Sequence, residues 1–286
     1  MKNKPDGLFF NRQFCAEAQN CCDRRGEITC VISPRGLSVE RFGKEETMKL
    51  LNGIWQVGGP SLTHFFDATV YLVKGKDEYI LIDCGTPEGY EQIKENIRKA
   101  GVDPARITKI FGTHGHYDHV GAAYLWKEEF GTRLYLHELD REQVEKGDAE
   151  KTSASLLYGK DFTPCAVDGL LQEGDRYEAD GLLLEVLYTP GHTMGSVSFD
   201  VTADGYRLLI AGDAVWGGFS EKIGSDEAAW RQTLQKITAR HYDFYTFGHV
   251  NPQLIADADA RLREAQMAFA NYYNPWFKTF YETYRY

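Results

Sequence analysis

The segment His114–His119, with the sequence HGHYDH, constrains the fold of this 286-residue chain more than any other. It gathers three imidazoles and one carboxylate in a short stretch, and these are ligands that zinc, iron and manganese accept in proteins. A strand pattern over residues 107–111 runs into the segment, and an apolar helical pattern from Val120 to Trp126 follows it. We therefore expect a metal site on a strand-to-helix loop, where α/β sheets place their chemistry.

The spacing inside this segment favours two metals over one. His114 and His116 project together from one stretch of chain, whereas Asp118 and His119 begin the next turn. A single metal cannot easily use all four side chains. The segment therefore predicts a dinuclear centre.

Three segments further along the chain carry the same kinds of ligand. His192 lies in the segment TPGHTMGS at residues 189–196, Asp213 ends the triplet AGD, and His249 follows Gly248. With the HxHxDH pattern of residues 114–119, these segments resemble the metallo-β-lactamase superfamily. The resemblance extends over about residues 50 to 250 of the chain.

The resemblance implies a centre of two divalent metal ions, with zinc expected first and iron or manganese as alternatives. Two dications lower the pKa of a bound water toward neutrality, so the implied nucleophile is a metal-bound hydroxide. Asp118 is the implied catalytic residue, because a carboxylate ligand with one free oxygen can orient the nucleophile and carry a proton to the leaving group. The implied ligands are His114, His116 and His192 for the first metal, Asp118, His119 and His249 for the second, and Asp213 as the bridge.

The complete set of seven implied ligands is most similar to that of glyoxalase II and of the acyl-homoserine lactone lactonases, and it disfavours a β-lactam as substrate. We therefore expect hydrolysis of a small carboxylic ester, lactone or thioester. One alternative is a mononuclear iron persulfide dioxygenase, which uses a subset of the same ligands. Another is a non-catalytic, metal-containing protein that binds an effector in the pocket.

The pattern of apolar residues fits the αββα sandwich that the resemblance implies, an α/β fold in which two sheets pack face to face with helices outside. Helical spacing is expected from Tyr90 to Ala100 and around Trp230 to Ile237. The expected strands cover residues 54–57, 69–73, 79–83, 107–111, 182–188, 196–201, 206–211 and 244–247.

We expect three parts of the chain: an N-terminal extension over residues 1–48, a catalytic domain over residues 49–256 and a C-terminal helical tail over residues 257–286. The extension contains a candidate hairpin, residues 28–32 and 37–42 around the turn SPRG. The tail is unusually rich in aromatic residues, which predicts that it packs on the core, on a second copy in a homo-oligomer, or over the substrate pocket.

Three further residues are candidates for substrate binding. His64 lies on the loop between the first two strands of the catalytic domain, which in this superfamily often overhangs the metals. Tyr188 and Trp216 are close in sequence to His192 and Asp213, although such side chains are equally typical of a core. Another histidine, His241, follows a predicted helix and is expected to cap its C-terminus.

Composition narrows the range of partners to a small-molecule substrate. The formal charge of −10 and the absence of a basic stripe argue against nucleic acid, whose phosphates need Lys and Arg. No stretch approaches the length of a membrane span, and the N-terminal residues lack the apolar run of a secretory signal. We therefore expect a cytoplasmic protein that binds neither nucleic acid nor membrane.

Overall fold

The computed structural model describes residues 32–33, 36–37, 49–250 and 253–269. The chain divides into two compact units, residues 1–43 and residues 44–286. In the first unit, β1 (Ile32–Ser33) and β2 (Gly36–Leu37) pair antiparallel around the expected turn. The rest of the predicted hairpin lies outside the described residues.

The first sheet of the second unit has seven strands in the order β3-β4-β5-β6-β7-β8-β9. Neighbours from β3 to β6 run antiparallel, and neighbours from β6 to β9 run parallel. Its strands are β3 (Lys49–Leu51), β4 (Ile54–Gly58), β5 (Val70–Lys74), β6 (Tyr79–Ile82), β7 (Ile107–Phe111), β8 (Arg133–Leu136) and β9 (Gly169–Leu170).

Helices occupy the connections between the parallel strands, as parallel pairing requires. Helix α1 leads from β6 to β7, α2 and α3 lead from β7 to β8, and α4 with a π-helical turn, η4, leads from β8 to β9. Their bounds are α1 (Tyr90–Lys99), α2 (Tyr117–Val120), α3 (Ala123–Phe130), α4 (Glu138–Lys146) and η4 (Ala154–Tyr158).

The second sheet has five strands in the order β10-β11-β12-β13-β14. Four of them form an antiparallel meander, and β14 joins parallel to β13 after helix α5. Helix α6 follows β14. The bounds are β10 (Arg176–Ala179), β11 (Leu182–Tyr188), β12 (Val197–Ala203), β13 (Tyr206–Ile210), α5 (Glu227–Thr238), β14 (Phe244–Thr246) and α6 (Ala258–Phe269).

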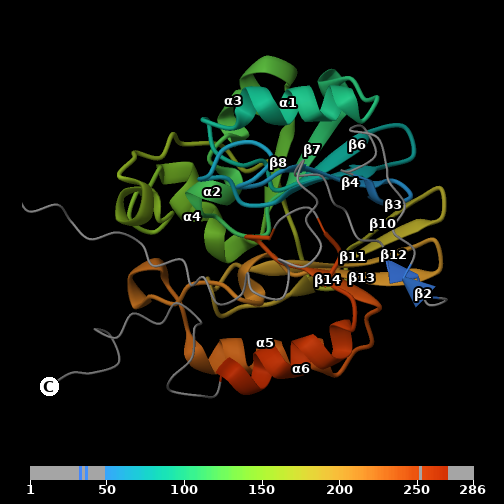
Figure 1. Cartoon of the computed structure of the whole chain (residues 1–286). Coiled ribbons are helices and arrows are strands. Elements are labelled where there is room, and N and C mark those ends of the chain that lie inside the picture. The colour runs from blue at the N-terminus through green and yellow to red at the C-terminus, as the bar shows by residue number, and fades with distance from the viewer. Residues whose placement is uncertain (1–31, 34–35, 38–48, 251–252, 270–286) are drawn as a thin grey trace, which may run out of the picture. The chain divides into compact units, whose positions relative to one another are not determined.

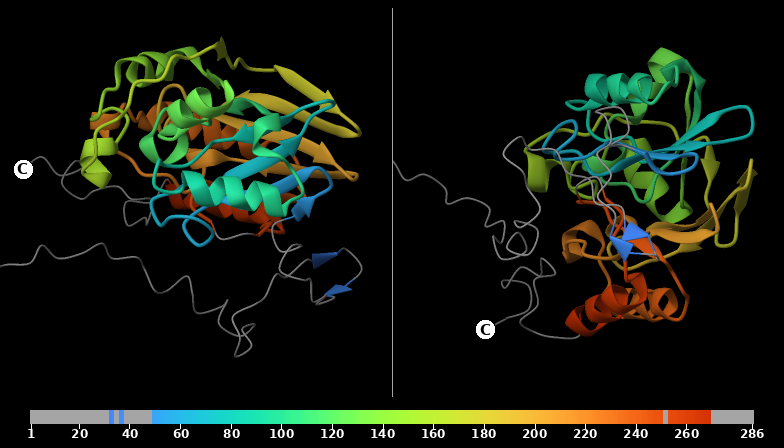
Figure 2. Two further views of the ribbon diagram at one scale, coloured as in Figure 1. Left: turned by 90° about the horizontal axis from the view of Figure 1, so that it is seen from above. Right: turned by 45° about the vertical axis from the view of Figure 1, so that its right-hand side comes forward.

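The elements of residues 49–269 form four layers, with α1 and α3 outside the first sheet and α5 and α6 outside the second (Figure 1). Figure 2 shows the same layers from two further directions. Both faces of each sheet are buried, so neighbouring residues of one strand enter different cores. Leu72 of β5 packs under the helices of the first sheet, whereas Tyr71 packs between the two sheets. Likewise Leu209 of β13 faces α5 and α6, whereas Leu208 faces the first sheet.

This arrangement confirms the predicted αββα sandwich. The strand expected at residues 182–188 has the bounds of β11, and the other expected strands match to within about two residues. The single helical pattern expected after the HGHYDH segment is in fact two helices, because the chain turns at Gly121 between α2 and α3.

Helix α6 packs on α5, and the ring of Phe269 lies 5.2 Å from that of Trp230. The first part of the predicted tail therefore belongs to the outer helical layer of the second sheet. The aromatic residues from 270 onward lie outside the described residues. No helix in the described part of the chain is long and apolar enough to cross a membrane.

Candidate metal centre

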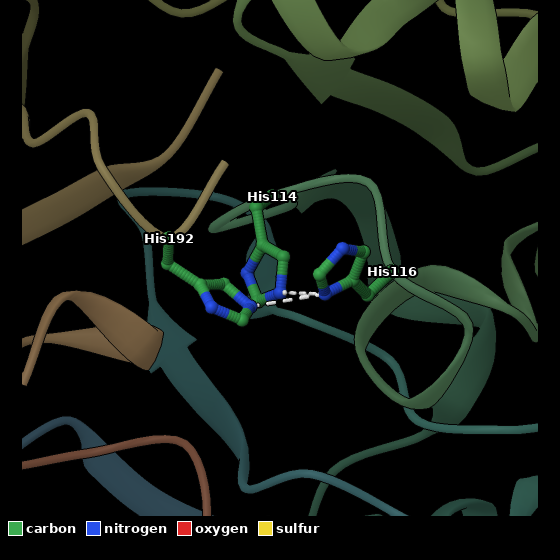
Figure 3. Close-up of side chains that lie close together, drawn as sticks. All are labelled: His114, His116 and His192. Atoms are coloured by element: carbon green, nitrogen blue, oxygen red, sulfur yellow. Dashed lines mark hydrogen bonds between the residues drawn. The ribbon is translucent and has the colours of Figure 1, made fainter. Parts of the chain in front are cut away.

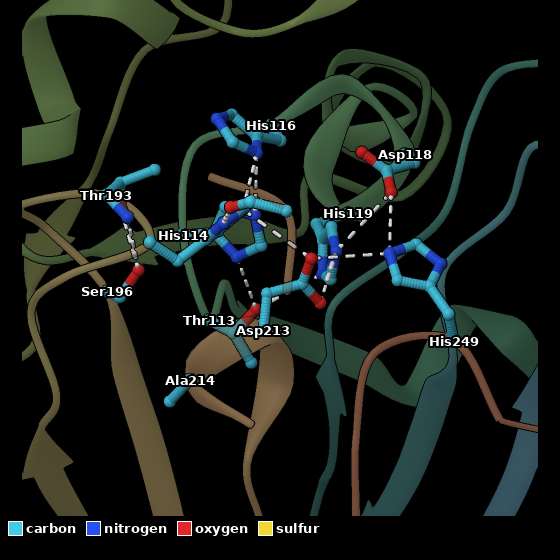
Figure 4. A network of polar contacts seen from close by, with 12 residues as sticks. Thr113, His114, His116, Asp118, His119, Thr193, Ser196, Asp213, Ala214 and His249 are labelled. Carbon is cyan, nitrogen blue, oxygen red and sulfur yellow. Dashed lines mark hydrogen bonds and ion pairs between the residues drawn. The ribbon is translucent and has the colours of Figure 1, made fainter. Parts of the chain in front are cut away.

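The seven predicted ligands lie together on segments that follow strands. Figure 3 shows His114, His116 and His192, and Figure 4 shows Asp118, His119, Asp213 and His249. The first sheet supplies the HGHYDH segment after β7. The second sheet supplies His192 from the loop between β11 and β12, Asp213 from the short helix η5 (Gly212–Ala214) after β13, and His249 after β14. The two sheets thus meet in one cluster of histidines and carboxylates.

One set of ligand atoms consists of three imidazole nitrogens from both sheets (Figure 3). Nδ1 of His116 lies 2.9 Å from Nε2 of His114 and 3.0 Å from Nε2 of His192. All three side chains are buried. Three nitrogens that converge in this way form one face of a tetrahedral metal site.

A second set combines Asp118, His119 and His249. Oδ2 of Asp118 lies 3.5 Å from Nε2 of His119 and 3.4 Å from Nε2 of His249. Asp118 and His119 are buried, whereas the side chain of His249 is 37% exposed. The second set therefore borders on solvent at His249.

Asp213 lies between the two sets. Its Oδ1 is 3.4 Å from Nε2 of His119, and its Oδ2 is 3.5 Å from Nε2 of His192 and 3.3 Å from Nε2 of His249. The chain leaves room for this carboxylate by placing Gly248 beside it, since a Cβ on that residue would come within 1.9 Å of Oδ1. One carboxylate thus reaches ligands from both sets.

Asp83 orients His119, a role that the sequence did not reveal. Its Oδ2 lies 2.8 Å from Nδ1 of His119, and its Oδ1 accepts the backbone N–H of Thr113 at 2.7 Å. Asp83 follows β6 with a left-handed backbone, φ 59°, which is uncommon for a residue other than glycine. A carboxylate behind a ligating imidazole fixes its ring and leaves the other nitrogen free for a metal.

Asp140 joins the two ligand loops and was also not anticipated. It is buried on α4, and its carboxylate accepts the N–H of Gly115 at 2.8 Å, the N–H of Gly195 at 3.0 Å and the hydroxyl of Thr193 at 2.8 Å. Gly115 belongs to the first sheet's loop, whereas the other two belong to the loop of His192. One carboxylate therefore sets the spacing of ligands from opposite sheets.

For His192 and His114, a hydrogen bond to Nδ1 fixes the tautomer and leaves Nε2 free for a metal. Nδ1 of His192 donates to the carbonyl of Gly218 at 2.6 Å, which leaves the lone pair of Nε2 directed into the cluster. The hydroxyl of Thr113 donates to Asp83 and lies 3.1 Å from Nδ1 of His114, so it can accept that N–H. Neutral imidazoles held in this way can bind a metal ion.

The centre also contains buried polar atoms that make no hydrogen bond with the described residues, among them Nε2 of His119 and Oδ1 of Asp213. A buried polar atom without a partner is costly, and a cation shared by such atoms would remove the cost. The donors are imidazole nitrogens and carboxylate oxygens, which suit first-row divalent metals. The residues present therefore fit two divalent cations.

The charges of the centre support the same conclusion. Burial holds the pKa of His114 and of His116 well below the ordinary value, so these imidazoles remain neutral. Burial also opposes a proton on His119, but Asp118, Asp83 and Asp213 outweigh it and raise the pKa of His119. The surplus of negative charge that attracts this proton would attract a cation equally.

The three candidates for substrate binding lie on loops or at a strand end. His64 is half-buried, accepts the N–H of Phe66 at 3.2 Å and packs against Phe65 and Phe66. Tyr188 donates its hydroxyl to the carbonyl of Met194 at 2.9 Å. Trp216 has a left-handed backbone, φ 63°, and is half-buried beside the core under α5 and α6.

This sandwich, with ligand loops from both sheets at one edge, defines a class of metal-dependent hydrolases. The sequence model of the metallo-beta-lactamase superfamily matches residues 65–249, more than half of the chain. The chain therefore belongs to the metallo-β-lactamase superfamily. The expected enzyme class and fold are thereby confirmed.

Two relatives illustrate the range of the family. The chain is 32% identical over 152 residues to the probable metallo-hydrolase YqgX of Bacillus subtilis, a match that covers 53% of this chain and 67% of that protein. It is 30% identical over 147 residues to a hydroxyacylglutathione hydrolase of Rhizobium meliloti, covering 50% of this chain and 48% of that protein. Each match thus covers about half of the present chain.

Solved structures resemble a larger part of the chain. The metallo-beta-lactamase GOB-18 from Elizabethkingia meningoseptica is 27% identical with a TM-score of 0.63, covering 81% of this chain and 95% of that one. The class B3 di-zinc metallo-beta-lactamase LRA-12 from an Alaskan soil metagenome is 26% identical with a TM-score of 0.63, covering 78% and 92%. The sandwich is thus shared with enzymes whose named substrate is a β-lactam.

Proposed function

We propose that this protein is a dinuclear metal-dependent hydrolase of a small carboxylic ester, lactone or thioester. The observation that carries the proposal is the position of Asp213, whose two oxygens reach ligands of both sets within 3.5 Å. A carboxylate at that place suits two cations, because it can be shared between the two sets. The similarity to a hydroxyacylglutathione hydrolase supports thioesters as one branch of the substrate class.

In this proposal each set of ligands holds one cation, zinc first, with iron or manganese as alternatives. Bound there, two divalent cations would supply a water acidified toward neutral pH and a Lewis acid for the substrate carbonyl. The holding residues would be His114, His116 and His192 for one cation, Asp118, His119 and His249 for the other, and Asp213 for both.

Asp118 would transfer a proton between the attacking water and the leaving group in this arrangement. Its Oδ2 faces His119 and His249, and a carboxylate held on one side keeps an oxygen that can accept a proton from the attacking water. The same oxygen can then donate that proton to the leaving alkoxide or thiolate. His119 cannot take this part, because its Nδ1 is engaged by Asp83.

Exposed apolar side chains support an apolar acyl group as part of the substrate. Phe65 is 70% exposed on the loop before β5, Leu157 is 69% exposed in η4, and Met194, two residues after His192, is 37% exposed. Apolar side chains bind a hydrocarbon chain better than a charged one. His64, Tyr188 and Trp216 are proposed to contact the rest of this small-molecule substrate.

The first test combines metal content with turnover. Protein purified without added metal is assayed by plasma mass spectrometry, and hydrolysis is measured on a panel of short esters, lactones, thioesters and one β-lactam. About two first-row metals per chain and hydrolysis of an acyl substrate are expected. One iron per chain with oxygen consumption on glutathione persulfide would identify a dioxygenase instead. Two metals with ligand binding but no turnover would identify an effector-binding protein.

Two variants test the assignment of residues. Asp118→Ala and His116→Ala should each lower kcat/KM by at least about 10³-fold while the protein stays folded, because each removes part of the charge that stabilises the transition state. His241→Ala removes an exposed histidine outside the centre and serves as the control. Turnover that is unchanged in either of the first two variants would contradict the assigned site.

A further inference from the structure

The loop of residues 59–69, here called the β4–β5 loop, ends among the proposed ligands. The backbone N–H of Ala68 donates to the carbonyl of Asp118 at 3.1 Å. The N–H of the next residue donates to the carbonyl of Gly248 at 2.7 Å. Because Gly248 precedes the partly exposed His249, the β4–β5 loop lies beside the side of the centre that borders on solvent.

Two phenylalanine rings of the β4–β5 loop pack toward helix α2, which carries Asp118. The ring centroid of Phe66 lies 5.0 Å from that of Tyr158, which in turn lies 5.4 Å from that of Tyr117 on α2. Phe65 packs on Phe66 with centroids 4.2 Å apart, yet it remains largely exposed. A large apolar ring exposed beside a site is suited to contact an apolar part of a ligand.

Asp67 follows these two rings in the sequence and is fully buried. Its Oδ2 accepts the hydroxyl of Thr63 and, at 3.1 Å, the backbone N–H of His64. Its Oδ1 accepts the hydroxyl of Thr86 and, at 2.8 Å, the backbone N–H of the same residue. One oxygen therefore binds the β4–β5 loop, and the other binds the segment that follows β6.

The segment after β6 is itself bound to a proposed metal ligand. The backbone N–H groups of Cys84 and Gly85 both donate to the carbonyl of His119, at 2.7 and 3.1 Å. The segment also makes room for the carboxylate, since a Cβ on Gly89 would lie 1.7 Å from Oδ2 of Asp67. The hydrogen bonds of Asp67 thus connect the β4–β5 loop to the support of the metal centre.

We propose that Asp67 is a positioning residue for substrate binding: its buried carboxylate fixes the β4–β5 loop so that Phe65 and Phe66 line the site of an apolar acyl chain. The inference rests on the proposed function, because it concerns the acyl group of the proposed substrate. Four donors converge on one carboxylate, and hydrogen bonds to an ionised group are stronger than those between neutral groups. A loop that is ordered before the substrate arrives lowers the cost of binding, so its loss acts on KM.

The test is Asp67→Asn, which keeps the size of the side chain but places an NH2 group against two donors. Hydrolysis of p-nitrophenyl acetate and p-nitrophenyl octanoate is measured with metal-loaded protein. KM for the octanoate ester should rise about tenfold with kcat within about twofold. KM for the acetate ester should stay within about twofold, because its short acyl group does not reach the loop. Metal content should equal that of the wild type.

A second variant, Thr86→Val, removes only the hydroxyl on the anchored side of Asp67. It should raise KM for the octanoate ester in the same direction, and the double variant should resemble Asp67→Asn, because this hydroxyl acts on the loop through Asp67. Asp200→Asn is the matched control: Asp200 is also buried and charged, but it lies on β12 and binds Arg207. It should leave both KM values unchanged. Thermal melting establishes that each variant is folded.

The outcomes separate this inference from the proposed function. An unchanged KM for the octanoate ester in Asp67→Asn would overturn the positioning role, even if the enzyme is a hydrolase. A fall in kcat with both esters would also overturn it, since Asp67 would then act on the metal centre.

A wild type that hydrolyses nothing in the panel would contradict the proposed function, and calorimetry with octanoate would then test the inference. Binding about tenfold weaker in Asp67→Asn than in wild type would support the positioning role. Equal binding, or no binding to either protein, would overturn it. Faster amide hydrogen exchange of residues 61–66 in the variant is expected in every case that supports the role.

Discussion

The two sheets hold their ligands in different ways. The first sheet presents four of the seven proposed ligands on one segment, His114–His119, which runs into helix α2 and is tied to its surroundings by Asp83, Thr113 and Asp140. The second sheet presents the other three on three separate segments, with Asp213 in the short helix η5. Among them, His249 is 37% exposed, and the described contacts of its ring are to Asp118, Asp213 and His119, all members of the centre itself.

We refer to the ligands of the first sheet as the first half of the centre and to those of the second sheet as the second half. The protein orders the first half, whereas in the second half Gly218 holds His192 and His249 depends more on the metals. Buried hydrogen bonds to backbone groups hold the HGHYDH loop whatever lies between the ligands. An exposed imidazole without such support gains its order from the ion that it binds. The predictions below test this contrast.

The largest effect is expected from removing one ligand in each half. His114 is a member of two of the three candidate ligand groups, so His114→Ala should lose most of both metals. His249→Ala should retain about one of the two, because the three histidines of the other set remain. Metal content after gel filtration is the measurement, with His241→Ala as control. An equal loss of metal in His114→Ala and His249→Ala would contradict the difference between the two sheets.

The next effect concerns the support of His119. Asp83→Asn keeps the shape of the side chain but weakens the hydrogen bond to Nδ1, so metal affinity should fall about 10–100-fold. Asp67→Asn is the control: Asp67 is equally buried and bonds Thr63 and Thr86, but no ligand. Competition with a chromophoric chelator measures the affinity. Equal affinities for both variants would show that Asp83 does not support the metal.

A smaller effect should follow removal of the metals by a chelator. Amide hydrogen exchange of the loops around Asp213 and His249 should accelerate more than that of residues 112–120. Asp140 and Asp83 still hold the latter loop, whereas His249 loses its partner ion. Mass spectrometry of peptic fragments resolves these loops. Uniform acceleration across both halves would show that the protein orders neither of them.

The smallest effect is a pH dependence outside the centre, where His241 after α5 pairs with Asp259 of α6. His241 pairs with Asp259 at 2.6 Å instead of capping the preceding helix, and this hydrogen bond together with the charge of Asp259 raises the pKa of His241. The pair therefore stabilises the fold fully below about pH 6.5, and the contribution disappears as the pH rises through the raised folded pKa. The urea midpoint of wild type should exceed that of His241→Gln slightly at about pH 6, and the difference should vanish in alkali. A difference in urea midpoint that does not change with pH would contradict the dependence of stability on the protonation of His241.

The sequence predicted those parts of the molecule whose signals are local. The HGHYDH segment follows a strand, and most strands are short runs rich in apolar residues, such as ITKIF in β7 and LLLEVLY in β11. The three ligands of the second sheet were found only through the resemblance to a family. Their residue types and spacing alone carry little information.

Residues that act across long stretches of sequence could not be found in this way. Asp83 and His119 are 36 residues apart, and Asp140 reaches Gly115 and Gly195 in opposite directions along the chain. Neither aspartate belongs to a motif.

The burial of both faces of both sheets has a consequence for how this enzyme can diversify. A change in any strand alters one of three packed cores, so mutations there mainly cost stability. New substrate preferences must therefore arise from the loops at the ligand edge, such as the one that carries Phe65 and the turn that carries Leu157. Evolution can exchange those loops while the scaffold and its seven ligands stay the same.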